Sequence, residues 1–187
     1  MREARFHGLD LIAAPRRVMT PRSSTEPLVD RALELMGPGP VRVADVGTGS
    51  GAIAVALAAR APHAEIWATD SSAEAVWLAR VNAARLGVGD RVRVLRGDLL
   101  EPIPPPLDLV VANLPYLPEC EADDPDIEDE PREAVVAPGD GLDPYRRLLA
   151  QCETRLTHDG VVVIQFRRRI LEARQAELRA LSLRLAA

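Results

Sequence analysis

A glycine-rich turn stands in the first third of the chain, at residues 43–51, and reads Val-Ala-Asp-Val-Gly-Thr-Gly-Ser-Gly. It follows an apolar, β-branched run at residues 41–46 and precedes an alanine-rich segment at residues 50–60. That order predicts a buried strand, a tight turn and a helix. Because glycines lack a Cβ atom, a ligand can approach the backbone closely there. The Gly-x-Gly-x-Gly spacing fits the dinucleotide pattern only if Ala52 serves as its third small residue, so several ligands stay open.

The rest of the chain alternates between short β-branched runs and longer Ala/Leu/Arg-rich stretches. This alternation is typical of α/β proteins in which crossover helices join parallel strands. We expect a Rossmann-like α/β fold, with a mostly parallel central sheet and helices on both faces. The predicted strands cover residues 41–46, 64–69, 91–95, 107–112 and 161–165, and the predicted helices cover residues 26–35, 50–60, 71–86, 142–156 and 168–187.

Two segments fall outside this alternation. Residues 4–12 and 17–19 are expected to form a small N-terminal hairpin, and the acidic, proline-containing residues 115–140 an irregular segment over the carboxyl edge of the sheet. The chain has 187 residues, 47% of them hydrophobic, which fits a single domain. Within it, we predict that residues 1–37 form a hairpin and helix that lead into a cofactor-binding core at residues 38–187.

Charge and cysteine content narrow the function classes. The net charge is −5, which gives no electrostatic reason to bind a phosphate backbone, so nucleic acid is the less expected partner. Cys120 and Cys152 show no metal-ligand spacing, and neither structural zinc nor a disulfide framework is expected. No apolar run approaches the ~20 residues of a membrane-spanning helix, and no secretory signal begins the chain. We therefore expect a cytoplasmic protein without a membrane partner.

Acidic residues mark the ends of three predicted strands. Because parallel strands end at one edge of the sheet, Asp45, Asp70 and Asp98 are expected near one another. Asp70 can accept from two ribose hydroxyls, in NAD or in S-adenosylmethionine alike, and Asp98 from an adenine amino group. Helix capping by Asp70 or Ser71 is the alternative. The candidate cofactor-binding residues are Asp45, Gly47, Thr48, Gly49, Gly51, Asp70, Ser71, Gly97, Asp98, Leu99 and Asn113.

The tetrapeptide Asn113-Leu114-Pro115-Tyr116 directly follows the predicted strand at residues 107–112. It is therefore expected beside the glycine turn. The Asn113 side-chain oxygen and the Leu114 carbonyl can offer two acceptors to one planar NH2 group, with the Tyr116 ring as a wall. A plain Asn-x-Pro turn is the alternative, but the position beside a nucleotide site favours the functional role.

At these residues the sequence resembles the class I S-adenosylmethionine-dependent methyltransferases that alkylate planar amino nitrogens, whose signature at this point is Asn-Pro-Pro-Tyr or a close relative. Within that class it is most similar to the protein-(glutamine-N5) methyltransferases of the release-factor type. The resemblance covers roughly residues 4–165. It is carried by residues 6–9, 20–26, 45–51, 113–116, 130–131 and 139–148.

The resemblance implies methyl transfer from S-adenosylmethionine to the side-chain amide of a glutamine in a protein such as a translation release factor, with no metal. It implies that Asn113 Oδ1 and the Leu114 carbonyl accept the two amide hydrogens while Tyr116 packs on the planar group. The implied catalytic residues are Asn113, Leu114, Pro115 and Tyr116. The implied substrate-binding residues are Asn113, Pro115, Tyr116, Arg22 and Glu26.

The sequence departs from the family pattern at three places. Leu114 stands where proline is usual, at a position that would contribute its backbone carbonyl. The chain begins at the hairpin, where the family has a helical domain for substrate recognition. After residues 161–165 only a helix is predicted where the family has two more strands, and Gln165-Phe166-Arg167 stands where it tends to have Glu-Ile-Gly. We expect an exposed sheet edge, or one that a second copy or a partner completes.

Two other functions remain open at this point. A nucleic-acid N-methyltransferase could use the same tetrapeptide on the amino group of a flipped adenine or guanine, although the negative charge disfavours it. A non-catalytic cofactor-binding or partner subunit is the other. The tetrapeptide itself argues against an NAD-dependent oxidoreductase.

Overall fold

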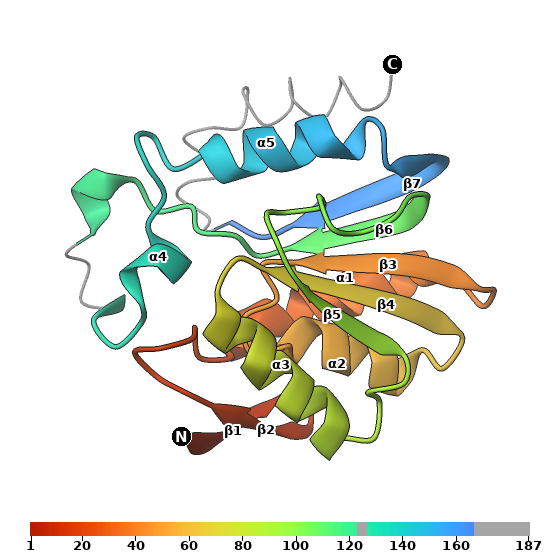
Figure 1. The fold of residues 1–187 in the computed structure, drawn as a ribbon, viewed down its shortest axis with the longest axis horizontal. Coiled ribbons are helices and arrows are strands. Elements are labelled where there is room, and N and C mark those ends of the chain that lie inside the picture. The colour runs from red at the N-terminus through yellow and green to blue at the C-terminus, as the bar shows by residue number, and fades with distance from the viewer. Residues whose placement is uncertain (123–126, 167–187) are drawn as a thin grey trace.

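A five-stranded sheet forms the centre of the molecule (Figure 1). The structure, a computed structural model, describes residues 1–122 and 127–166. The strand order is β5-β4-β3-β6-β7, and every neighbouring pair is parallel. These strands are β3 (Val41–Val46), β4 (Ala64–Asp70), β5 (Val92–Arg96), β6 (Leu107–Ala112) and β7 (Leu156–Ile164). The order confirms the predicted Rossmann-like class, and it places the crevice where such sheets bind ligands between β3 and β6.

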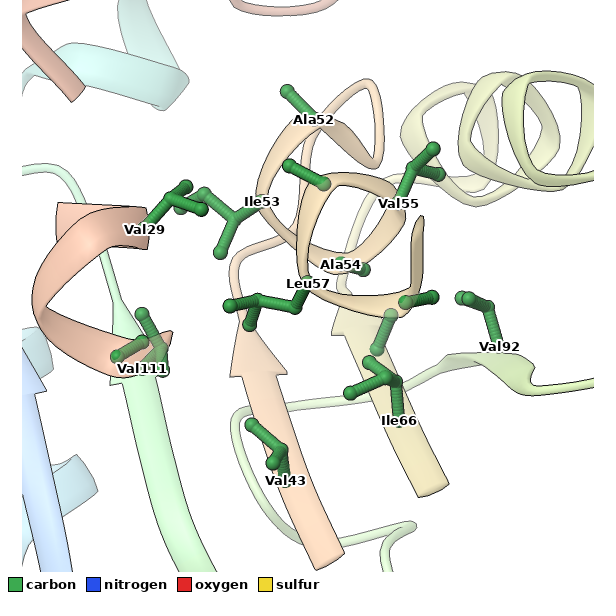
Figure 2. Close-up of a cluster of buried hydrophobic side chains, with 14 of the residues drawn as sticks. Val29, Val43, Ala52, Ile53, Ala54, Val55, Leu57, Ile66, Val92 and Val111 are labelled. Atoms are coloured by element: carbon green, nitrogen blue, oxygen red, sulfur yellow. The ribbon is translucent and has the colours of Figure 1, made fainter. Parts of the chain in front are cut away.

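Helices cover both faces of the sheet (Figure 1). On one face lie α1 (Glu26–Met36), α2 (Ala52–Arg60) and α3 (Ala73–Arg85), and on the other lies α5 (Asp143–Cys152). Figure 2 shows Ile53 of α2 beside Val29 of α1, and Leu57 on the side of α2 that faces the sheet. Because α2 contacts the sheet and both neighbouring helices, it is apolar on every side rather than along one stripe.

The N-terminal hairpin differs from the prediction. β1 (Arg2–Phe6) pairs with β2 (Leu9–Ala13), whereas residues 17–19 form no strand. The turn is His7-Gly8, with φ values of 48° and 79°, and such positive values are what a tight two-residue hairpin turn requires. The predicted N-terminal hairpin is confirmed, but the strand predicted at residues 17–19 was wrong, because the turn at His7-Gly8 places both strands before Ala14.

A buried asparagine joins this hairpin to the core. Asn82 in α3 is fully buried, and its Oδ1 accepts from the Ile12 N–H at 2.8 Å. Its Nδ2 donates to the Ile12 carbonyl at 3.0 Å and to the Ser50 carbonyl at 2.8 Å. One side chain therefore connects β2, α3 and the glycine turn.

The segment between β6 and α5 is largely irregular, as predicted for residues 115–140. Its described residues include η2 (Glu119–Glu121) and α4 (Arg132–Val135), and an isolated bridge pairs Leu117 with Val136. A further short turn, η1 (Ser23–Thr25), precedes α1. Figure 1 shows α4 beside the ends of the central strands, where the sheet presents its carboxyl edge.

The last described strand begins earlier than predicted. α5 ends at Cys152, and β7 begins at Leu156, which pairs with Leu107 of β6. The predicted helix at residues 168–187 lies outside the described residues. Within residues 1–122 and 127–166, β7 ends the strand order, and no helix has the length and apolar character to cross a membrane.

Candidate functional site

The glycine turn lies at the carboxyl end of β3. Gly47, Gly49 and Gly51 have φ values of 71°, 56° and 80°. Residues with a side chain rarely adopt such positive φ values. A Cβ at Gly51 would lie 2.9 Å from the Ala79 Cα, so this glycine allows the close approach of α3. A Cβ at Gly47 would lie 2.7 Å from the Leu114 Cδ2, so that glycine lets the turn contact the tetrapeptide. Gly47 and Gly51 therefore permit close packing of the turn against its neighbours.

Asp45 supports the turn from inside the protein. Its side chain is fully buried, and Oδ2 accepts from Thr48 Oγ1 at 2.6 Å and from the Ala54 N–H at 3.0 Å. No described residue donates to its Oδ1. Burial raises the pKa of Asp45 to about 7, against the opposing effect of the two hydrogen bonds. Three of the predicted cofactor-binding residues, Asp45, Thr48 and Gly51, therefore support the turn from within. They do not line the neighbouring cavity around Asp70.

A cavity of about 250 Å³, which we call the Asp70 cavity, opens at the carboxyl ends of the central strands. Asp70 Oδ2 accepts from the Gly49 N–H and Oδ1 from the Ser72 N–H, each at 2.9 Å. Burial raises the pKa of Asp70, and these hydrogen bonds oppose the rise. A carboxylate has further lone pairs, so it can also accept from ligand hydroxyls. The predicted residues that line this cavity are Gly47, Gly49, Asp70, Ser71, Gly97, Asp98, Leu99, Asn113, Leu114 and Pro115.

Asp98 has a partner that the sequence did not reveal. Arg147 of α5 donates to Asp98 Oδ2, and both residues line the Asp70 cavity. Their side chains are 50% and 39% exposed, so water screens the ion pair and its contribution to stability is small. A ligand amino group can therefore compete for the Asp98 carboxylate.

A second cavity of about 380 Å³, which we call the Tyr116 cavity, lies beside the first. Asn113 Nδ2 donates to Thr25 Oγ1 at 3.2 Å, while no described residue donates to Asn113 Oδ1. The rings of Tyr116 and Phe166, with centroids 5.7 Å apart, form an aromatic part of its lining. The cavity therefore combines a free amide oxygen with aromatic surface.

The backbone of Leu114 is held by Tyr145, a fully buried residue of α5. The Tyr145 hydroxyl accepts from the Leu114 N–H at 3.0 Å and lies 3.0 Å from both the Leu114 and the Gln165 carbonyl. Since a hydroxyl has one hydrogen, it donates to one carbonyl at a time. Burial raises the pKa of Tyr145 well above its ordinary value, so the hydroxyl keeps this hydrogen. The Leu114 carbonyl, which was predicted to bind the substrate, therefore already has the Tyr145 hydroxyl as a neighbouring donor.

The two cavities share a wall. Asn113 and Leu114 line both of them, together with Met19 and Ala134. A ligand in one cavity can therefore approach a ligand in the other at this wall. Juxtaposition of two bound reactants is the arrangement that a group-transfer reaction requires.

Of the two upstream residues predicted to bind substrate, Arg22 lines a cavity and Glu26 does not. Arg22 lines the Tyr116 cavity and pairs at 3.0 Å with Glu130, whose side chain is only 4% exposed. Glu26 lines neither cavity, because its Oε1 accepts from the His7 N–H of the hairpin at 2.8 Å. Among the tetrapeptide residues, Pro115 lines only the Asp70 cavity and Tyr116 only the Tyr116 cavity.

Residues of the site that were not predicted to act there include Thr25, Tyr145 and Gln165. The first two fall in residues 20–26 and 139–148, which carry the family resemblance, but the sequence does not tell which side chain reaches a cavity. Gln165 was visible only as a departure from the family pattern. The described part of the chain contains no group of three His, Cys, Asp or Glu side chains able to hold a metal ion.

Fold and cavities together define a doubly wound α/β protein with a nucleotide-type cavity between β3 and β6 and a second cavity beside it. Comparison with known families specifies the class, since the model of the methyltransferase small domain matches residues 30–128. The chain belongs to the methyltransferase small domain family. Membership implies S-adenosylmethionine as the methyl donor.

Curated relatives include the release factor glutamine methyltransferases of Moorella thermoacetica and Deinococcus radiodurans. They are 41% and 42% identical to this chain over 164 and 166 residues. The alignments cover 86% and 87% of this chain but only 58% and 59% of the relatives, so the chain spans less than two thirds of their length.

Solved structures show the same fold at low sequence identity. The ribosomal protein L11 methylase of Lactobacillus delbrueckii subsp. bulgaricus has a TM-score of 0.62 at 24% identity, over 89% of this chain and 70% of that one. The precorrin-6y C5,15-methyltransferase of Geobacter metallireducens has a TM-score of 0.61 at 17% identity, over 90% of this chain and 76% of that one. Both are methyltransferases by name, which agrees with the family of this chain.

Proposed function

We propose that this chain is a cytoplasmic S-adenosylmethionine-dependent N-methyltransferase that modifies the side-chain amide of a glutamine in a protein, with a translation release factor as its substrate. The observation that carries the proposal is the wall of Asn113 and Leu114 between the two cavities, because it would bring donor and acceptor together. The names of the relatives, which are about 40% identical over most of the chain, support the substrate.

The residues of the Asp70 cavity fit S-adenosylmethionine. The Asp70 carboxylate would accept from the ribose hydroxyls, and Asp98 from the adenine amino group. Gly47 and Gly49 leave the backbone of the turn open to the ligand on the same cavity. When bound, this cofactor supplies an electrophilic methyl group.

Orientation of the acceptor is the main catalytic contribution of the protein. An amide nitrogen is a weak nucleophile because its lone pair is delocalised, so it must be held in the correct direction. Asn113 Oδ1 accepts an N–H of the glutamine amide, and the rings of Tyr116 and Phe166 pack on the planar group and exclude water. The amide nitrogen loses one proton to water after the N–C bond has formed, so no strong general base is needed.

Calorimetric titration tests the cofactor. We expect micromolar binding of S-adenosylmethionine and S-adenosylhomocysteine and none of NAD. Asp70→Ala should weaken binding at least tenfold, whereas Asp90→Ala, which removes an exposed carboxylate that does not line the cavity, should leave it unchanged. Binding of NAD in place of the other two ligands would contradict the proposal.

Transfer of a labelled methyl group tests the acceptor. We expect label on a glutamine of an unmethylated bacterial release factor and none on DNA or transfer RNA. Asn113→Ala should reduce the rate about a hundredfold, in the range seen when a single group that orients or polarises a reactant is removed. Label on nucleic acid alone would instead support the adenine- or guanine-directed function.

A further inference from the structure

Two carboxamide side chains end neighbouring strands at the Tyr116 cavity. Asn113 follows β6 and Gln165 follows β7, and both line the cavity. The Gln165 N–H donates to the Ala112 carbonyl at 3.1 Å, which continues the parallel pairing of Ala112 with Ile164. Since paired strands lie about 4.8 Å apart, the two side chains start from adjacent backbone positions.

One short turn, η1, accepts hydrogen bonds from both amide nitrogens. Asn113 Nδ2 donates to Thr25 Oγ1, and Gln165 Nε2 donates to the Ser24 carbonyl, each at 3.2 Å. The amide oxygens receive no such partner: Gln165 Oε1 is buried with none among the described residues, and no described residue donates to Asn113 Oδ1. The turn therefore binds the NH2 groups of both side chains, and the two amide oxygens remain available to accept hydrogen bonds from a ligand.

Thr25 is itself held firmly. It is only 6% exposed, and its N–H donates to the Arg22 carbonyl at 2.9 Å. Arg22 in turn pairs with the buried carboxylate of Glu130, which also accepts from the Thr20 N–H at 2.9 Å. The β-branched side chain of Thr25 has few rotamers. Its hydroxyl oxygen is thus held beside Asn113, where it accepts from Nδ2.

The direction of the Asn113 amide decides which substrate group it can bind. An asparagine side chain can present its oxygen or, after a half turn, its NH2 group. With Nδ2 bound to Thr25, the oxygen remains for the substrate, and an oxygen accepts from the N–H of an amide. A carboxylate has only acceptors, so Asn113 offers it no hydrogen-bond donor in this orientation.

We propose that Thr25 is a positioning residue that fixes the Asn113 carboxamide with its oxygen available to the substrate, and that it thereby makes the Tyr116 cavity select a glutamine amide over a glutamate carboxylate. The inference rests on the proposed function, because it assigns the amide to that cavity.

Three variants isolate the Thr25 hydroxyl. Thr25→Val keeps the shape of the side chain but removes the acceptor, and Thr25→Ser keeps the acceptor. Ser23→Ala is the matched control, because Ser23 belongs to the same turn but is exposed and lines neither cavity. For each protein we would measure kcat/KM with an unmethylated release factor and the affinity for S-adenosylmethionine. Affinities for the release factor and for its target Gln→Glu variant would be compared in the presence of S-adenosylhomocysteine.

We expect the wild type, Thr25→Ser and Ser23→Ala to prefer the glutamine form about tenfold or more, the ratio that corresponds to one hydrogen bond replaced by a repulsive contact. Thr25→Val should lower kcat/KM about tenfold and bring the affinity ratio close to one, while its affinity for S-adenosylmethionine stays within twofold. A general loss of stability would weaken both forms equally and leave the ratio unchanged.

The outcomes separate the inference from the function on which it rests. A folded Thr25→Val protein that keeps the wild-type ratio and rate overturns the role of Thr25 while the methyltransferase activity stands. A wild-type chain that binds and methylates no release factor overturns both. If Thr25→Val does not fold, Thr25→Ala, which removes the same acceptor with a smaller side chain, is judged by the same ratio.

Discussion

The buried carboxyl of Asp45 makes a quantitative prediction about the pH dependence of stability. Burial raises its pKa in the folded protein to about 7, whereas an unfolded chain has the ordinary value of about 3.9. The folded state therefore binds the proton more tightly. The contribution of this group to stability is complete below about pH 4 and is lost as the pH rises through about 7.

The size of the effect follows from these two values. At pH 5.5 the tighter proton binding contributes about 2 kcal/mol to the free energy of unfolding, and at pH 8.0 almost nothing. Asp45→Asn removes the titration. The asparagine oxygen can still accept from Thr48 Oγ1 and the Ala54 N–H, since both hydrogen bonds go to the same carboxyl oxygen. The variant should therefore fold and lose most of the difference between the two pH values.

Urea denaturation at pH 5.5 and 8.0 measures this difference directly. The wild type should lose about 2 kcal/mol more than Asp45→Asn between the two conditions. The burial-raised pKa of Asp70 contributes to both proteins, and repulsion from Asp70 is only a minor cause of the raised pKa of Asp45, so the comparison reports mainly the burial of Asp45. Asp90→Asn, at an exposed position, serves as the control and should behave like the wild type. An Asp45→Asn protein with the full wild-type pH dependence would refute the argument from burial.

Two further substitutions test the packing of the tetrapeptide. Tyr145→Phe leaves the buried Leu114 N–H without its acceptor and should lower the free energy of unfolding by about 2 kcal/mol in thermal or urea denaturation; an unchanged midpoint would show that the hydroxyl does not hold Leu114. Gly141→Ala places a Cβ against the Tyr116 carbonyl at a φ of 86° and should destabilise by about 2 kcal/mol or more. Gly139→Ala shares a positive φ of 61° but meets nothing within 4 Å, so it should cost only about 1 kcal/mol; equal losses would contradict the proposed contact.

The parts of the site that lie at strand ends could be predicted from the sequence. The β-branched run before Gly47, Asp70 at the end of β4 and the tetrapeptide after β6 all stand where the pattern changes from strand to turn. In a parallel sheet these ends meet at one edge whatever the details of packing. Both cavities duly contain residues from that set.

Contacts between distant side chains could not be predicted in this way. The pairs Arg147–Asp98 and Thr25–Asn113 are separated by 49 and 88 positions, and they depend on how α5 and η1 lie against the sheet. Hydrophobic periodicity gives the buried face of a helix but not its shift along the strands. Glu26 illustrates the same limit, because its neighbour Thr25 reaches the cavity while its own carboxylate binds the hairpin.

The hydrogen bonds of Asn82 have a consequence for amide hydrogen exchange. A two-stranded hairpin is marginally stable in water by itself, so the amides of β1 and β2 would ordinarily exchange rapidly through fraying. The Ile12 N–H, however, is bound to a fully buried side chain of α3. Its exchange requires the hairpin to separate from that helix, so its protection should match that of α3 rather than that of the outer β1 amides. The N-terminal strands then open as part of the cooperative unit that contains the glycine turn.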